Sequence, residues 1–193
     1  DLAAERALSS FHATHRAVNS MLYQLPVGKG RRFLNQGGMA NLLIGGWELG
    51  TLLSIQSGFP LTMTSGRDQS NIGAGFDRPN QIAGGSTELP RDQRNANRWF
   101  NTSIFALQPL GTFGNVGRNS IIGPGIVQWD LSLLKVFNFT ERVGLQFRFE
   151  AFNAANHLNL GNPDASVTSS SFGRITTART NMRELQFGAK LFF

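Results

Sequence analysis

The chain contains stretches in which every second residue is apolar, and the clearest of them is the last, residues 182–193. From Leu185 to Phe193 the odd positions are apolar, and most residues between them are polar or small. Period-two alternation of this kind is typical of a β-strand with one face in an apolar medium and the other in water. That medium is either a protein core or lipid, because about 9–11 tilted residues also suffice to cross a bilayer as a strand.

The same alternation recurs along the chain and predicts an all-β protein with about five long strands. The expected strands lie near residues 15–25, 41–57, 126–139, 143–153 and 182–193. A short turn at residues 140–142 makes the third and fourth strands a hairpin. Residues 58–125 and 154–181 are rich in turn-forming residues and are expected to be long loops. Within the first loop, residues 99–109 have enough apolar content to form a packed island.

One apolar stretch, residues 39–55, also allows a transmembrane helix with Gly46 and Gly50 at a small-xxx-small spacing. In that helix Glu48 would lie near the middle of the bilayer, at a cost of about 3 kcal/mol. Glycine weakens a helix, and the stretch is shorter than the roughly 20 apolar residues that a spanning helix needs. A strand is therefore the favoured interpretation.

The connections between the expected strands alternate in length, as they do in outer-membrane barrels. Residues 26–40 and 140–142 are the shorter connections, and residues 58–125 and 154–181 are the long ones. Such barrels have short periplasmic turns and longer extracellular loops, and a periplasmic carboxy terminus would give every connection the appropriate length. Five strands cannot close a barrel, and an open edge is not tolerated in lipid. We therefore expect an antiparallel transmembrane β-barrel segment, the carboxy-terminal piece of a larger barrel.

A barrel wall would turn its odd-numbered residues to lipid and its even-numbered residues to the lumen, since successive side chains in a strand point to opposite faces. The expected lipid-facing residues are Val127, Trp129, Leu131, Leu133, Phe137, Val143, Leu145, Phe147 and Phe149. The expected lumen-facing residues are Glu48, Asp130, Arg148, Glu150, Glu184 and Lys190. These charged residues either line a substrate path and hold a plug or form cross-strand pairs in a hydrated wall, and the second interpretation is favoured.

Composition and charge fit a protein of sheets and turns. Charged residues make up 16% of the 193 residues, whereas Gly (22) and Phe (16) are abundant. The formal charge is +6, but the arginines are scattered and form no stripe, which argues against nucleic acid as a partner. There are no cysteines, so thiolate metal sites and disulfides are excluded.

The apolar series of the last strand consists of Leu185, Phe187, Ala189, Leu191 and Phe193. A series of this kind that ends on an aromatic carboxy-terminal residue resembles the terminal assembly signal of bacterial outer-membrane β-barrels. The resemblance implies docking on the barrel-assembly machinery, and an ordinary amphipathic strand is the alternative.

Several segments, taken in order, resemble the carboxy-terminal barrel region of TonB-dependent outer-membrane receptors. They are LPVGKGRRFL (25–34), GGWELGTLLSIQSGFPLTMTSGRD (45–68), DRPNQI (77–82), RWFNTSIFALQPLGTFGNVGRNSIIGPG (98–125), DLSLLKVFNFTERVGLQFRFEAFNAANHLNLGNP (130–163) and FGRITTAR (172–179). The type they resemble most is the Oar-like group with an amino-terminal carboxypeptidase-regulatory-like domain, abundant in acidobacteria. The resemblance covers essentially the whole chain.

This resemblance implies a plugged barrel of roughly 22 strands in the outer membrane. Such a receptor takes up a large or scarce ligand with energy passed through TonB. The implied partners are outer-membrane lipid and lipopolysaccharide, the rest of the same barrel with its plug, the TonB system through the missing amino-terminal region, and the barrel-assembly machinery.

Other candidate chemistry is sparse, and we expect no enzymatic activity and no cofactor. The spacing of the three histidines predicts no metal site. Gly28, Lys29 and Gly30 lack the rest of a phosphate-binding loop and are expected to be a turn. The loop arginines either contact lipopolysaccharide phosphates or, as we favour, pair with nearby Asp and Glu. These arginines are Arg67, Arg78, Arg91, Arg94, Arg98 and Arg118, and the acidic partners are Asp68, Asp77, Glu88 and Asp92.

Two further function classes remain open at this point. The first is a soluble secreted β-sandwich that binds carbohydrate or a cell surface. In it the odd-numbered residues, among them Leu131, Phe147 and Phe187, would be sealed beneath a second sheet. The second is a hydrolytic enzyme, which the lack of a catalytic constellation disfavours.

Overall fold

The computed structural model describes residues 5–35, 37–73, 75–82 and 85–193. The chain divides into two compact units, and each is described by itself. Unit 1 comprises Asp1–Arg16, Gln56–Ile126 and Asn159–Thr180. Unit 2 comprises Ala17–Ile55, Val127–Leu158 and Asn181–Phe193.

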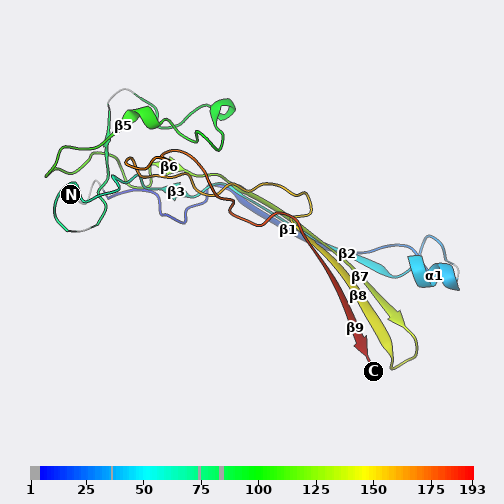
Figure 1. Cartoon of the computed structure of the whole chain (residues 1–193). Coiled ribbons are helices and arrows are strands. Elements are labelled where there is room, and N and C mark those ends of the chain that lie inside the picture. The colour runs from blue at the N-terminus through cyan, green and yellow to red at the C-terminus, as the bar shows by residue number, and fades with distance from the viewer. Residues whose placement is uncertain (1–4, 36, 74, 83–84) are drawn as a thin grey trace. The chain divides into compact units, whose positions relative to one another are not determined.

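Unit 2 is built on a five-stranded sheet, which Figure 1 shows as a ribbon of long neighbouring strands. The order across the sheet is β1 (Arg16–Gln24), β2 (Trp47–Gln56), β7 (Ile126–Asn138), β8 (Gly144–Phe152) and β9 (Glu184–Phe192). The β7–β8 and β8–β9 pairs are antiparallel. Thus β2 and β7 are neighbours although a long segment separates them in the sequence. The predicted all-β fold is confirmed.

The register places the odd-numbered residues of three strands on one face. Leu133 lies opposite Phe149, and Phe149 lies opposite Phe187 on β9. The rings of Phe149 and Phe187 pack with their centroids 5.0 Å apart. Leu131, Ala151 and Leu185 form a parallel row one step along the strands. Period-two alternation in the sequence therefore becomes one continuous apolar face.

The hairpin turn between β7 and β8 forms at the expected place. The N–H groups of Phe139 and Thr140 donate to the carbonyl oxygen of Val143, over 2.9 and 3.1 Å. The Thr140 hydroxyl accepts from the N–H groups of Arg142 and Val143. Val143, expected in a strand, thus belongs to the turn that precedes β8.

The expected strand near residues 41–57 is wrong in its first third. Residues Met39–Ile44 form the short helix α1, and β2 begins only at Trp47. Residues 42–44 are three consecutive apolar residues without alternation, so the local pattern does not favour a strand there. Gly46 then adopts φ 71°, a left-handed conformation that suits glycine and redirects the chain into β2. Among the described residues, no helix is long and apolar enough to cross a membrane.

Unit 1 shows that the two expected loops are folded against each other. Its regular elements are short: β3 (Pro60–Leu61) pairs with β6 (Ile121–Ile122), β4 (Asn80–Gln81) pairs with β5 (Phe105–Ala106), and η1 (Arg91–Gln93) and η2 (Thr102–Ile104) are single 3₁₀ turns. The hydrophobic core consists of Met63, Phe100, Ile104, Phe105, Val116 and Ile121. The expected island at residues 99–109 therefore lies at the centre of a larger core.

The second long segment, residues 154–181, completes this core. Phe172 packs edge-on against Phe100, with the ring centroids 5.3 Å apart. The N–H of Thr64 donates to the Ala165 carbonyl, and the N–H of Val167 donates back to the Thr64 carbonyl, both over 2.9 Å. Two segments that read separately as loops thus form one hydrogen-bonded unit.

Candidate functional site

The odd face of the sheet is apolar, and the chain leaves it at least partly open. None of the nine expected lipid-facing residues is buried, and Val127 and Trp129 are exposed. Leu131 and Phe147 are partly exposed, and Phe187 is 68% exposed. The second layer that a β-sandwich requires over these residues is therefore not present in the described parts of the chain.

Two tryptophans on this face have their indole N–H groups bonded within the protein. Trp129, near the start of β7, donates to the Thr51 hydroxyl over 2.8 Å. Trp47, at the first residue of β2, donates to the Leu43 carbonyl over 3.0 Å. Satisfied N–H groups allow the indole rings to lie at the border of an apolar medium without an unpaired polar atom.

The last strand is the most open part of this face. Leu185, Phe187, Ala189 and Leu191 are all exposed, and Phe193 follows the end of β9 with 95% of its surface exposed. Strand β9 pairs with β8 along one edge, and its other edge has no strand partner among the described residues. An unpaired edge is a template for another strand. The role of this series in assembly stays a prediction.

The charged residues of the even face make local contacts and no common cluster. Arg148 lies 3.8 Å from Glu150 on the same strand, and the Glu184 carboxylate accepts from the Asn181 amide over 2.7 Å. Across the sheet, Lys190 lies opposite Gln146. Such short-range pairs are what a hydrated wall contains.

The remaining two acidic residues of this face hold neighbouring groups in place. The Asp130 carboxylate accepts from the Gln128 amide over 2.7 Å and from the Asn153 N–H over 2.8 Å. Glu48 accepts from the Gln24 side chain. Asp130 thereby fixes the end of β8, where Asn153 leaves the strand with φ 49°.

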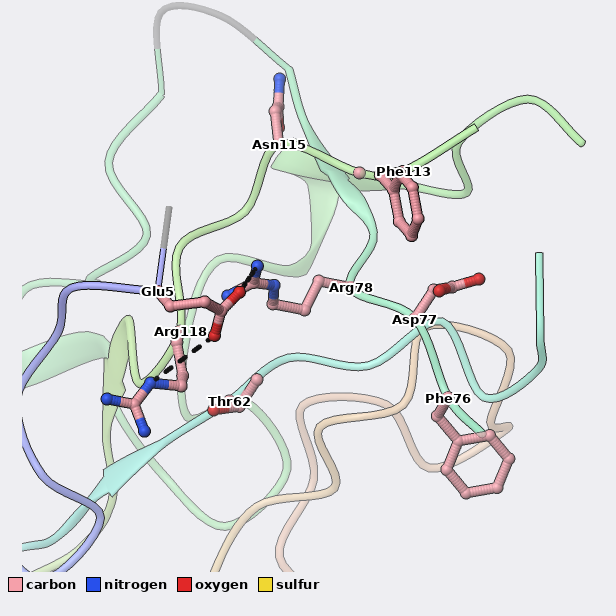
Figure 2. Close-up of a pocket in the computed structure, with 9 residues that line it drawn as sticks. Glu5, Thr62, Phe76, Asp77, Arg78, Phe113, Asn115 and Arg118 are labelled. Carbon is pink, nitrogen blue, oxygen red and sulfur yellow. Dashed lines mark hydrogen bonds and ion pairs between the residues drawn. The ribbon is translucent and has the colours of Figure 1, made fainter. Parts of the chain in front are cut away.

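Unit 1 contains an open pocket of about 760 Å³ (Figure 2). The carboxylate of Glu5 is shared by two arginines: it pairs with Arg78 and lies 3.9 Å from Nε of Arg118. Two exposed rings, Phe76 and Phe113, also line the pocket. Two guanidinium groups thus converge on the Glu5 carboxylate, and with Asp77 also in the lining the acidic and basic side chains of this pocket balance.

The loop arginines and acids pair differently from the sequence prediction. Arg94 pairs with Glu88 at 3.0 Å, as expected. Arg78 and Arg118 instead share Glu5, which lies far away in the sequence. Sequence reasoning missed Glu5 because no local pattern links it to these arginines.

The two loop aspartates bond to their own turns. Asp77 accepts from the Ser70 N–H over 2.5 Å, and Asp68 accepts from the Gly73 N–H over 2.7 Å. Short Asp side chains favour such local bonds to the backbone. The Gly73 hydrogen bond favours the charged carboxylate and lowers the pKa of Asp68, and the Ile72 N–H and Ser70 hydroxyl act in the same direction against the opposing effect of desolvation.

One basic residue, Lys135, interrupts the apolar series of β7 on the odd face. Lys135 is 2% exposed, and its Nζ donates to the Gly45 carbonyl over 2.5 Å. The same ammonium lies 4.9 Å from the Phe137 ring and 5.3 Å from the Trp47 ring. The segment between β1 and β2 thus covers a charge that the sheet alone would expose.

No group of three or more His, Cys, Asp or Glu side chains that could hold a metal occurs in the described ranges.

Comparison with known proteins identifies the class of this sheet. A family model described as "Outer membrane beta barrel domain" matches residues 1–186, which include nearly all of both units. No curated protein and no solved structure matches the chain.

Proposed function

The chain belongs to the outer membrane beta barrel domain family, and from this membership we propose that it is part of the wall of a TonB-dependent transporter. The family places the protein in the outer membrane as a β-barrel. The transport function, the Oar-like type and the uptake of a large or scarce ligand are the proposed refinement. They are supported by the motifs at residues 45–68, 98–125 and 130–163, which occur in the order typical of such receptors.

The observation that carries the barrel-wall assignment is the open apolar face of β7, β8 and β9. Leu133, Phe149 and Phe187 lie side by side on it, and none is buried. A protein in water rarely leaves such a surface uncovered. In a membrane this face contacts acyl chains, while the inner strands satisfy their backbone hydrogen bonds with their neighbours and the rest of the barrel pairs with the two edges. A soluble β-sandwich is not supported, because it needs these residues in its core.

The connections between the strands supply the proposed orientation. The turn at residues 139–143 joins one end of β7 to β8, and residues 58–125 and 154–181 join strands at the opposite end. We place the short turn in the periplasm, as barrels of this type have it. Unit 1, with the pocket of Figure 2, then lies on the extracellular side and meets ligand and lipopolysaccharide first.

The remaining partners follow from the same proposal. The rest of the barrel pairs with the open edges of β1 and β9, a plug contacts the even face, and the assembly machinery engages the series that ends at Phe193. No catalytic activity is proposed for the chain.

The test uses the complete gene in its host, with a cysteine introduced in the region that precedes residue 1. The proposal expects a plug domain encoded there, recovery of the protein from detergent-extracted outer membranes, and a disulfide cross-link to a cysteine variant of TonB. Recovery from outer membranes without a plug and without a cross-link would agree with the barrel assignment but refute the transport function. Recovery from the soluble fraction would refute both.

A further inference from the structure

The segment between β1 and β2 forms a second pocket, of about 340 Å³, against the end of β7. Three basic side chains line it: Lys29, Arg31 and Lys135. No Asp or Glu occurs among the described residues of its lining. The pocket therefore carries three positive charges and no acidic side chain to balance them.

Lys135 places a buried ammonium group in the lining of this pocket. The side chain is almost completely buried, and one N–H of its ammonium donates to the Gly45 carbonyl. The Trp47 and Phe137 rings lie against the same ammonium. Its other two N–H groups have no hydrogen-bond acceptor in the described part of the chain. Since a buried charge needs hydrogen-bonding partners, an anion in the pocket would supply the missing acceptors.

The backbone around the pocket is fixed by close packing. Gly28 has φ 118°, and a Cβ there would lie 2.7 Å from Cα of Gly45. The side-chain oxygen of Asn41 accepts from the Lys29 N–H over 2.6 Å. These contacts hold the loop against Gly45 and set the carbonyl that Lys135 uses. The guanidinium of Arg31 is oriented by a 3.0 Å bond to Gln24.

The same segment exposes apolar side chains beside the basic ones. Exposed apolar residues of this segment are Phe33, Leu34, Met39, Leu42, Leu43 and Ile44. A free phosphate would use the basic groups and leave these side chains in water. A phospholipid uses both, because its phosphate binds Lys and Arg while its acyl chains lie against the apolar surface.

We propose that this pocket binds the phosphate group of an anionic phospholipid, with the acyl chains against α1. The proposal rests on the orientation given above, in which the segment between β1 and β2 lies on the periplasmic side and meets the phospholipid leaflet. The bound lipid would hold the β1–β2 segment at the membrane surface and balance the buried charge of Lys135.

The experiment measures lipid retained by the full-length receptor after extraction from the outer membrane in mild detergent. Native mass spectrometry identifies the lipid, and purified receptor is then titrated with vesicles of phosphatidylglycerol or of phosphatidylethanolamine. The test variant is Lys29→Gln with Arg31→Gln, both at exposed positions. The control is Arg142→Gln, a basic residue in the turn at the same end of the sheet but outside the pocket.

The expected result is retention of phosphatidylglycerol by the wild type and by Arg142→Gln, with on the order of tenfold weaker binding in the double variant. Lys135→Met is expected to lose the lipid too, and heat-modifiable mobility on gels shows whether it has folded. Equal loss in Arg142→Gln, binding of inorganic phosphate without lipid, or retention of lipopolysaccharide instead would each overturn the proposal. The TonB cross-link is read separately, so a receptor that keeps the cross-link but retains no phospholipid refutes this inference alone.

Discussion

The two units use the same kinds of apolar side chain in opposite ways. In unit 1, Phe100 is 1% exposed and is surrounded by Met63, Phe105 and Phe172. In unit 2, Phe187 lies on β9, and most of its side chain is exposed. Burial under protein is how a chain in water treats phenylalanine. The difference teaches that unit 2 is built for an apolar medium that the chain itself does not provide.

Polar groups show the same contrast. In unit 1, the buried hydroxyl of Ser65 donates to the buried Gln108 side chain over 2.8 Å, as in the interior of a water-soluble domain. In unit 2, backbone groups pair between neighbouring strands of the sheet, and Trp47 and Trp129 satisfy their indole N–H groups locally. Unit 1 therefore follows the rules of folding in water, and unit 2 those of folding in lipid.

The largest expected effect comes from a substitution in the core of unit 1 that should leave unit 2 unchanged. Phe100→Ala removes a buried ring that packs edge-on against Phe105 and Phe172, and should cost about 3–5 kcal/mol of stability in unit 1. Trypsin added to intact cells should cleave the variant faster within residues 58–125, while the amount of barrel in the outer membrane is unchanged. Phe113→Ala, at an exposed ring, is the control and should behave as wild type. A fall in membrane insertion with Phe100→Ala would mean that the units do not fold independently.

The next effect tests the open face of unit 2. Leu133→Arg places a charge near the middle of β7 on the odd face, which should cost about 2–4 kcal/mol if that face meets the bilayer interior. Ser132→Arg is the matched control, because it places the same charge on the neighbouring even-numbered position. Urea unfolding of the purified barrel in vesicles measures both. Equal stability of the two variants would contradict the assignment of the faces.

A smaller effect concerns assembly rather than stability. Deletion of Phe193 removes the last residue of the apolar series and should lower the yield of folded full-length receptor severalfold, because the assembly machinery would lose an aromatic contact. Phe193→Tyr keeps the ring and should restore most of the yield. Quantitative gels of outer-membrane fractions, with heat-modifiable mobility as the readout of folding, measure the yield. Normal yield after the deletion would remove the assembly role.

The smallest effect is a pH dependence confined to unit 1. Because the pKa of Asp68 is lowered from its ordinary 3.8, the carboxylate stabilises its turn at pH values above that figure. The stabilisation should be lost as the pH falls through the lowered value. Amide hydrogen exchange at Ile72 and Gly73, followed from pH 5 to pH 3 and divided by the intrinsic exchange rate at each pH, should therefore show a falling protection factor in the wild type. Asp68→Asn should show little of this additional change, and an identical profile in both proteins would contradict the role of Asp68.

The strands and their faces could be predicted from the sequence because alternation is a property of the extended backbone itself. The side chain of a residue such as Phe147 points to the other face of the strand from those of its neighbours Gln146 and Arg148, whatever the strand packs against. The turn after Asn138 was also predictable, since it joins two clear alternating runs. The strand start at Trp47 was not, because the preceding apolar run has no period and a positive φ at Gly46 decides where the chain turns.

The sequence by itself thus determined the long strands and their apolar and polar faces. Only the tertiary structure decided which distant residues meet: Glu5 with Arg78 and Arg118, and Lys135 with Gly45. The physical reason is that a two-residue period follows from local backbone geometry. Contacts between residues far apart in the sequence depend on how whole segments pack, and no local pattern records that packing.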